Sequence, residues 1–370
     1  MRLHAGFALL VGALLSAAAH AALTPEEQRG RIELEVRQFE EALAHSGDLF
    51  ADPELDAYLQ TTLDRLFPEL EGRLRVKSFS DSDFNAFALP SGGIYFHTGA
   101  LLRISDEAQL ASVLGHEGIH VTADHTYKRV VQGKQQMGVL SVTILINPLL
   151  ASVMAVSSMA GFSREHEREA DRGGFERMAN AGYDPRAGSE LFARMDRELL
   201  ARKLPRGMYF YASHPRVKER VESFRELAAA RPEGGERAAE RYRAVAARAR
   251  MHALSQVHRR GDGKLLVFLL AEENLLETLP PEATYFLAEG YRLRNQPGDA
   301  ALAAAQYARA LEVAPQYAPT HQAVGLEHLR AGRRGEALAA FEKYLELEPD
   351  GARSAYVRQY IVNLKKELGQ

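Results

Sequence analysis

The sequence predicts a mainly helical α+β protein in two parts, a domain with a small β-sheet followed by a C-terminal array of helical repeats. Apolar residues recur at helical spacing along much of the 370-residue chain. Residues 75–102 are instead rich in β-branched and aromatic side chains around a turn signal. Prolines in the last third recur with a period typical of stacked helix pairs. Together these observations define the fold class.

Residues 1–21 have the pattern of a secretory signal peptide. Arg2 supplies a positive start, residues 7–15 form a short apolar core, and the AHA at residues 19–21 is a small-x-small cleavage site. The alternative is an uncleaved anchor helix, but the apolar run is short for a membrane span. We therefore expect cleavage after Ala21 and a mature protein in the periplasm.

The first domain is predicted to consist of helices around a small sheet. Residues 24–75 have a helix-starting Thr-Pro-Glu-Glu and helical spacing of apolar residues. Residues 75–102 are expected to form two short strands joined by a turn at Pro90. Helices are then expected over residues 105–132 and 163–181, each preceded by a capping serine or aspartate.

The C-terminal third carries a repeat. Pro281, Pro315 and Pro349 are spaced by 34 and 34 residues, and the last two follow the similar segments AALAAAQYARALEVAP and GEALAAFEKYLELEP. This period and pattern are typical of tetratricopeptide helix pairs. The alternative is a run of unrelated amphipathic helices. We predict a repeat domain over residues 281–370, preceded by a helical linker or degenerate repeat over residues 226–280.

Composition and charge narrow the classes of function. The net charge is −3 and the pI is about 6.5, so no basic domain for nucleic acid is expected. The chain has no cysteine, which excludes thiolate metal ligands and a cysteine nucleophile. Any metal ion must therefore be held by nitrogen and oxygen atoms.

The segment VLGHEGIHVTADH contains His116, Glu117 and His120 in the order H-E-x-x-H. Positions four apart lie on one face of a helix, so the two histidines can share a metal ion. Glu117 is rotated by about 100° from His116, where it can act as a base on a water molecule at the metal. The alternative is a chance match, and a catalytic zinc also needs a third protein ligand.

The helix SREHEREADRGG supplies candidates for the remaining roles. Glu167 and Asp171 are also four apart. Glu167 can be the third ligand, and Asp171 can accept a hydrogen bond from the other ring nitrogen of a ligating histidine. The alternative is a solvated helix face laced by ion pairs between its glutamates and arginines. Beside an H-E-x-x-H motif, the metal site is the preferred interpretation.

These motifs resemble those of a known family. NAFALPSGGIYFHTGAL, VLGHEGIH, SREHEREADRGG, AGYDP and SHP follow one another over roughly residues 60–220. The chain resembles the HtpX/CAAX-prenyl-protease family of zinc metallopeptidases and, with its leader and repeats, is most similar to periplasmic BepA-type protease/chaperones. The resemblance implies a zincin-type domain over residues 22–225, with one Zn²⁺ per chain on His116, His120 and Glu167.

The resemblance also directs attention to residues around the motif. It places His214 close to the zinc, where it could stabilise the oxyanion or occupy the open metal position; a plain surface role is the alternative. His125 and His166 are interpreted as support residues. Gly118 stands where the family has a larger apolar residue, and glycine costs about 1 kcal/mol relative to alanine within a helix. It is expected to loosen the helix or open room beside the metal.

Residues 135–163 contain no charged side chain, and the segment is long enough to span a bilayer. A single crossing would separate His120 from Glu167 by about 30 Å, whereas both must lie roughly 2 Å from one zinc. Pro148 in the middle indicates a helical hairpin that doubles back. We expect it to be buried over the active-site helix, with contact to a membrane surface or an unfolded client as the alternatives.

The expected function is that of a periplasmic zinc endopeptidase acting on unfolded or misassembled proteins, with outer-membrane proteins as the class that the resemblance implies. The repeats would bind a client or the outer-membrane assembly machinery. The strand near residues 92–98 would pair with an extended substrate. One alternative is a chaperone or scaffold for outer-membrane protein assembly with a latent or structural metal site. Another is a membrane-embedded processing peptidase.

Overall fold

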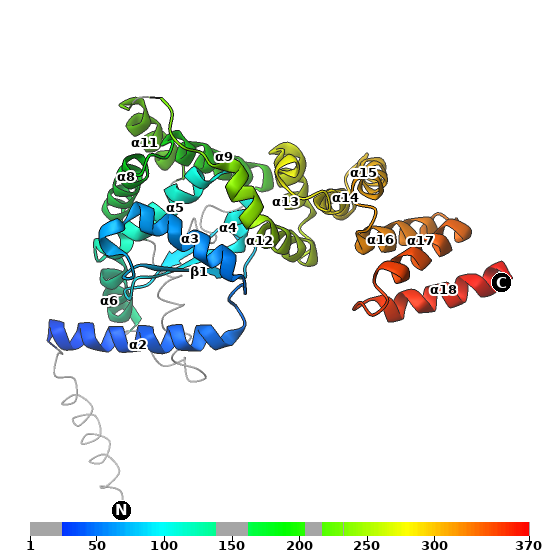
Figure 1. The fold of residues 1–370 in the computed structure, drawn as a ribbon, viewed down its shortest axis with the longest axis horizontal. Coiled ribbons are helices and arrows are strands. Elements are labelled where there is room, and N and C mark those ends of the chain that lie inside the picture. Colours follow the sequence, from blue (N-terminus) through cyan, green and yellow to red (C-terminus); the bar gives the residue numbers. More distant parts are fainter. Residues whose placement is uncertain (1–23, 138–161, 204–216, 232, 370) are drawn as a thin grey trace, which may run out of the picture.

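The computed structural model describes residues 24–137, 162–203, 217–231 and 233–369. The predicted signal peptide, most of the apolar segment and His214 lie outside these residues. The described part is mainly helical with one small sheet, as predicted. Figure 1 shows helices packed around the sheet in the first part of the chain, and an arc of helices that extends from them to the C-terminus. Within the described ranges, no helix is long and apolar enough to cross a membrane.

The N-terminal segment 24–75 forms two α-helices and a short 3₁₀ turn (Pro68–Leu70). Helix α2 (Pro25–Ser46) begins at a capping box in which Thr24 and the third helical residue exchange hydrogen bonds. Gly47 ends it with a φ of 81°, a left-handed conformation that glycine adopts without strain. Helix α3 (Pro53–Leu66) starts afresh at a proline. The segment is therefore helical as expected, and Gly47 and the following proline divide it.

The sheet has three strands where two were expected: β1 (Arg75–Phe79), β2 (Ala86–Ala88) and β3 (Gly93–His97). The strand order is β1-β3-β2, with β1 parallel and β2 antiparallel to β3. The predicted turn joins β2 to β3. A polar SDSD run separates β1 from β2, which is why the first expected strand divides.

The strand order shows that β3 is not free to pair with an extended substrate, as was expected of the strand near residues 92–98. Strand β3 is central, so β1 and β2 occupy both of its edges. The outer edge of β1 is also occupied, because the backbone N–H of Phe50 donates to Ser78 at 3.0 Å and Leu49 bridges Phe79. Among the described residues, the outer edge of β2 is the one that carries no backbone partner.

The helices that form the site follow the sheet. Helix α4 (Thr98–Arg103) leads into α5 (Glu107–Thr122), whose first turn is capped by the side chain of Asp106. The predicted helix 105–132 is broken after α5, and α6 (His125–Met137) begins as a separate helix. Asp124 lies at the break with a φ of 59°, a left-handed conformation that aspartate tolerates better than most residues.

Helices α8 (Arg164–Asn180), α9 (Arg186–Arg202), α11 (Val217–Ala229) and α12 (Ala239–Arg259) complete this part of the molecule. Helix α8 has the predicted bounds, because Ser163 caps it and a glycine in the left-handed conformation follows it. Helix α5 is buried at every position through its first twelve residues and packs against α3, α8 and α9. It is therefore the central helix of the core.

Two glycines allow α5 and α8 to approach closely. A Cβ added to Gly115 would lie 3.0 Å from the carbonyl oxygen of Gly174, and one added to Gly174 would lie 2.7 Å from the backbone nitrogen of His116. Side chains at these positions would force the two helices apart. This contact brings the H-E-x-x-H motif beside the glutamate and aspartate of α8.

The C-terminal third forms helices that pack against their neighbours in the chain. These helices are α13 (Gly263–Val267), α14 (Ala283–Arg294), α15 (Asp299–Val313), α16 (Ala318–Arg330), α17 (Arg334–Leu347) and α18 (Ser354–Leu368). A π-helical turn at Phe268–Glu272 and a 3₁₀ turn at Leu275–Thr278 join α13 to α14. The helices α14 to α17 lie between Pro281 and Pro349, and Pro315 separates the first pair from the second. Their assignment as tetratricopeptide repeats stays a prediction, as do the domain boundaries.

A buried carboxylate on α14 joins this helix to α12 and α15 by hydrogen bonds. Glu289 on α14 accepts hydrogen bonds from His258 on α12, Arg292 on α14 and Tyr307 on α15. Burial alone would raise the pKa of Glu289, but these three donors outweigh it and lower the pKa to about 2. The charge therefore persists at neutral pH and joins three helices.

Candidate metal centre

Helix α5 places the two histidines of the motif side by side. His116 and His120 are 0% exposed, and their Nε2 atoms lie 3.1 Å apart. Positions four apart on a helix face the same way, so both rings point to one side of α5. The other face of α5 is packed into the core, which leaves the rings little freedom to turn.

Helix α8 brings a carboxylate to the same point. An oxygen of Glu167 lies 3.3 Å from Nε2 of His120, and the other lies 3.8 Å from Nε2 of His116. One donor atom from each of these three buried residues lies within 4.8 Å of the others. Two imidazole nitrogens and one carboxylate oxygen, with room for water, form the ligand set of catalytic zinc sites. The residues present therefore fit a zinc ion.

Asp171 and Arg220 both contact Nδ1 of His116. Oδ1 of Asp171 lies 2.9 Å from this nitrogen. Nη2 of Arg220 lies 3.0 Å from the same nitrogen. Arginine can only donate and a carboxylate can only accept, so these two contacts do not by themselves locate the ring proton. With a metal ion on Nε2, the proton would lie on Nδ1 and be donated to Asp171. The structure thus places Asp171 where the sequence predicted a hydrogen-bond acceptor.

Sequence reasoning missed Arg220. This buried side chain of α11 binds both oxygens of Asp171, through Nε at 2.9 and 3.1 Å and through Nη2 at 2.7 Å to Oδ1. Its guanidinium also lies 4.0 Å from the ring centre of Phe192. A buried carboxylate needs such a partner, but the sequence is rich in arginine and offers no signal that singles out this one.

Glu117 is the third residue of the motif and is 1% exposed. Burial and the nearby charge of Glu167 hold the pKa of its carboxyl well above the usual range, while Arg220 and Arg129 act in the opposite direction. A carboxylate with a raised pKa is a stronger base. Burial thus favours the protonated form of this carboxyl, and a nearby cation would favour the carboxylate, the form that can accept a proton from water.

The rings around His120 restrict it from two sides. Phe162 stacks on it with ring centres 3.7 Å apart and an interplanar angle of 16°. Nδ1 of His125 lies 3.2 Å from Nδ1 of His120, and His166 stacks on His125 at 4.1 Å. The two histidines predicted as support residues do lie beside the site, and only His125 makes a hydrogen bond to a motif residue.

The space beside Gly118 corrects the expectation of a loosened helix. Helix α5 continues through this residue. A Cβ at Gly118 would lie 2.4 Å from the ring atoms Cε2 and Cζ of the buried Phe67. The ring of Phe67 thus occupies the room that a larger residue would need, and no opening beside the metal site results.

We expect Gly118→Ala to destabilise the fold. Alanine gains about 1 kcal/mol in helix propensity, but overpacking a core costs about 1–3 kcal/mol, so the net loss should approach about 1 kcal/mol. Urea unfolding would measure it. Gly30→Ala is the matched control, because a Cβ at this helical position meets no atom within 4 Å. Equal stabilisation by both changes would contradict the contact with Phe67.

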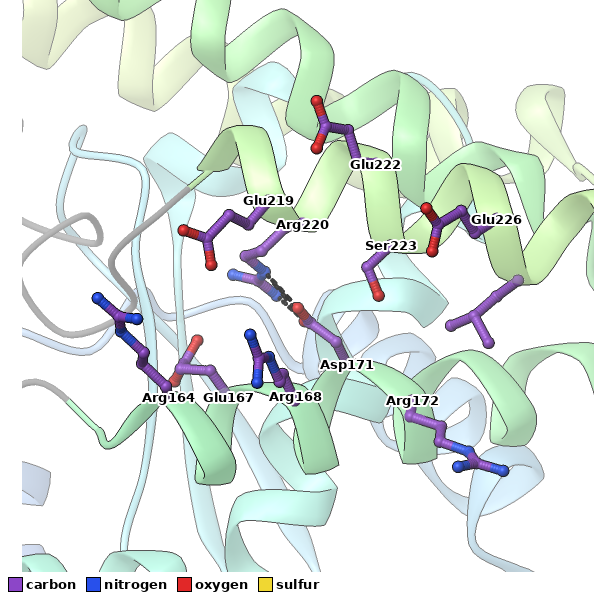
Figure 2. Close-up of a pocket in the computed structure, with 11 residues that line it drawn as sticks. Arg164, Glu167, Arg168, Asp171, Arg172, Glu219, Arg220, Glu222, Ser223 and Glu226 are labelled. Carbon is purple, nitrogen blue, oxygen red and sulfur yellow. Dashed lines mark hydrogen bonds and ion pairs between the residues drawn. The ribbon is translucent and has the colours of Figure 1, made fainter.

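A cavity of about 520 Å³ opens beside the metal-ligand candidates, between α8 and α11 (Figure 2). Glu167 and Asp171 line it from below, and Arg220 reaches from α11 to Asp171. Its remaining polar walls are arginines of α8 and acidic or hydroxyl residues of α11, namely Arg164, Arg168, Arg172, Glu219, Glu222, Ser223 and Glu226. The cavity therefore borders the site at Glu167 and Asp171, and its lining is polar and charged.

The combination of H-E-x-x-H on a central helix, a glutamate on the next helix and a base beside the ligands defines a metallopeptidase domain. Residues 53–228 match the family model of Peptidase family M48. These residues thus carry a Peptidase family M48 domain, which covers just under half of the chain.

Relatives agree with this class. The chain is 31% identical to the "Beta-barrel assembly-enhancing protease" of Yersinia pestis over 47% of this chain and 38% of that protein. It is 31% identical to the protein of the same name in Escherichia coli (strain K12), over 39% of this chain and 33% of that protein. It is 26% identical to the "Mitochondrial metalloendopeptidase OMA1" of Schizosaccharomyces pombe over 59% of this chain and 70% of that protein. The match thus spans well under half of the length of each of the two β-barrel assembly-enhancing proteases.

Proposed function

We propose that the protein is a zinc-dependent endopeptidase that cleaves unfolded or misassembled proteins. The observation that carries this proposal is the convergence of His116, His120 and Glu167 on one buried point, with Glu117 beside them. The three would hold the ion, one per chain. When bound, zinc polarises the scissile carbonyl and acidifies water.

The side chains of the site have distinct roles in this proposal. Glu117 takes a proton from the attacking water and returns it to the leaving amine. Asp171 keeps the proton of His116 on Nδ1, so that Nε2 faces the metal position. Arg220 holds Asp171 in place and compensates its buried charge. His214 near the metal remains part of the proposal on the basis of the family resemblance.

The open edge of β2 offers a place for an extended substrate. Strand β2 packs against α5, and strand addition recognises backbone groups rather than particular side chains. An unfolded segment could therefore bind whatever its sequence. The charged cavity beside Glu167 would then receive polar side chains next to the cleaved bond.

The cellular role is proposed from the N-terminal pattern and from two of the relatives. We place the protein in the periplasm, acting in outer-membrane protein assembly, with the helical repeats binding a client or the assembly machinery. The repeats also support the alternative, a chaperone or scaffold with a latent metal site. Helix α18 exposes Tyr356, Tyr360 and Val362, which could contact such a partner.

Cleavage of a flexible protein tests the proposal. The purified full chain is expected to degrade β-casein, to lose this activity on treatment with a zinc chelator, and to regain it on addition of zinc. A tightly folded protein of similar size should remain intact under the same conditions. Absence of cleavage in the zinc-loaded chain, together with suppression of client aggregation, would favour the chaperone.

A further inference from the structure

The two candidate histidine ligands have different partners behind them. His116 contacts the carboxylate of Asp171 directly. Behind His120 there is instead another histidine, since Nδ1 of His125 lies 3.2 Å from Nδ1 of His120. On the far side of this ring, Nε2 of His125 lies 3.1 Å from Oε2 of Glu169. The three side chains form a row from the metal position to the protein surface.

The break between α5 and α6 makes this row possible. On one continuous helix, residues five apart are rotated by about 140° from each other, so His125 would point away from His120. The left-handed Asp124 ends α5 and reorients the chain. An ion pair of 3.0 Å between Asp124 and Arg29 of α2 joins this turn to a neighbouring helix. His125 is fully buried as a result.

The protons of the row can be placed from its partners. If Nε2 of His120 faces the metal, its proton lies on Nδ1 and is donated to Nδ1 of His125. His125 then carries its own proton on Nε2 and donates it to Glu169. Both rings are neutral, every N–H has an acceptor, and the metal-facing nitrogen keeps its lone pair. A single arrangement of protons thus satisfies the two hydrogen bonds of this row.

We propose that His125 is a positioning residue for the metal ligand His120, and that Glu169 orients His125 in turn. The inference rests on the proposed metal site. His125 contacts His120 as the carboxylate of Asp171 contacts His116. It also links His120 to Glu169, whose side chain is 60% exposed. Because this carboxylate is in contact with water, the last link is the weakest.

Zinc affinity of the full chain tests the proposal through competition with a chromogenic chelator. His125→Leu removes the acceptor, and loss of such a partner is expected to lower zinc affinity by about 10–100-fold. His125→Asn offers an amide oxygen and should recover part of this loss. Glu169→Gln should weaken zinc binding less than His125→Leu. Cobalt-substituted His125→Leu should show a changed visible spectrum, because the ring of His120 is free to turn.

His166→Leu is the matched control. His166 stacks on His125 and, in the described part of the chain, makes no hydrogen bond to His120, so its replacement changes the packing and keeps the row. Its zinc affinity should stay close to that of the wild type. The unfolding temperature of each metal-free variant, measured beside the affinity, separates a loss of fold from a loss of zinc binding. Wild-type affinity in His125→Leu, or an asparagine variant no better than the leucine variant, overturns the proposal. A wild-type chain that binds no zinc overturns the metal site itself and this inference with it.

Discussion

Glu117→Gln is expected to abolish peptide hydrolysis while the chain keeps its zinc. Glutamine has nearly the same shape as glutamate and cannot accept the proton of the attacking water. General acid–base catalysis contributes about 10²–10⁴-fold, so the rate should fall by at least that factor. Cleavage of casein, measured beside zinc content, checks the result. The ligands His116, His120 and Glu167 are unchanged in this variant.

The same variant separates the enzyme from the chaperone. Glu176→Gln serves as control, since it removes a carboxylate from an exposed position on α8. If Glu117→Gln loses cleavage but still protects a client from aggregation, the protein has two functions. If both variants cleave casein at the wild-type rate, Glu117 is not the base.

Glu167→Ala is expected to reduce bound zinc from about one ion per chain to a small fraction. Removing a residue that merely orients a ligand costs about 10–100-fold in metal affinity, so the loss of a ligand should cost more. Mass spectrometry of the purified chain, or equilibrium dialysis, measures the difference. Cleavage should disappear with the metal.

The control for this variant is on the same helix. Glu165→Ala makes the same change of charge two residues away, at a position exposed to solvent. Its zinc content should equal that of the wild type. Equal zinc in Glu167→Ala would show that another residue completes the site, and the ligand assignment would have to change.

The sequence predicted the members of the site because helical spacing is a local property. His116 and His120, like Glu167 and Asp171, are each four apart, so each pair shares a face of its helix. Two histidines cannot hold a catalytic zinc alone. This need for a third ligand predicted that the two helix faces meet. The structure brings these four side chains together.

What the sequence did not predict depends on contacts between distant segments. Arg220 is one arginine among many, and only the packing of α11 against α8 identifies it. The ring of Phe67 beside Gly118 is equally non-local. The order of the strands follows from tertiary pairing rather than propensity, so the central position of β3 could not be read from its residues.

The close contact of α5 and α8 through Gly115 and Gly174 has a thermodynamic consequence. The helix pair that would hold the ion is also the centre of the core, so an ion bound to both helices acts as a cross-link between segments far apart in the chain. A ligand that binds only the folded state stabilises it by RT ln(1 + [L]/Kd). The lifetime of the folded protein would then follow the concentration of free zinc around it, and scarcity of zinc would remove the protein as well as its activity.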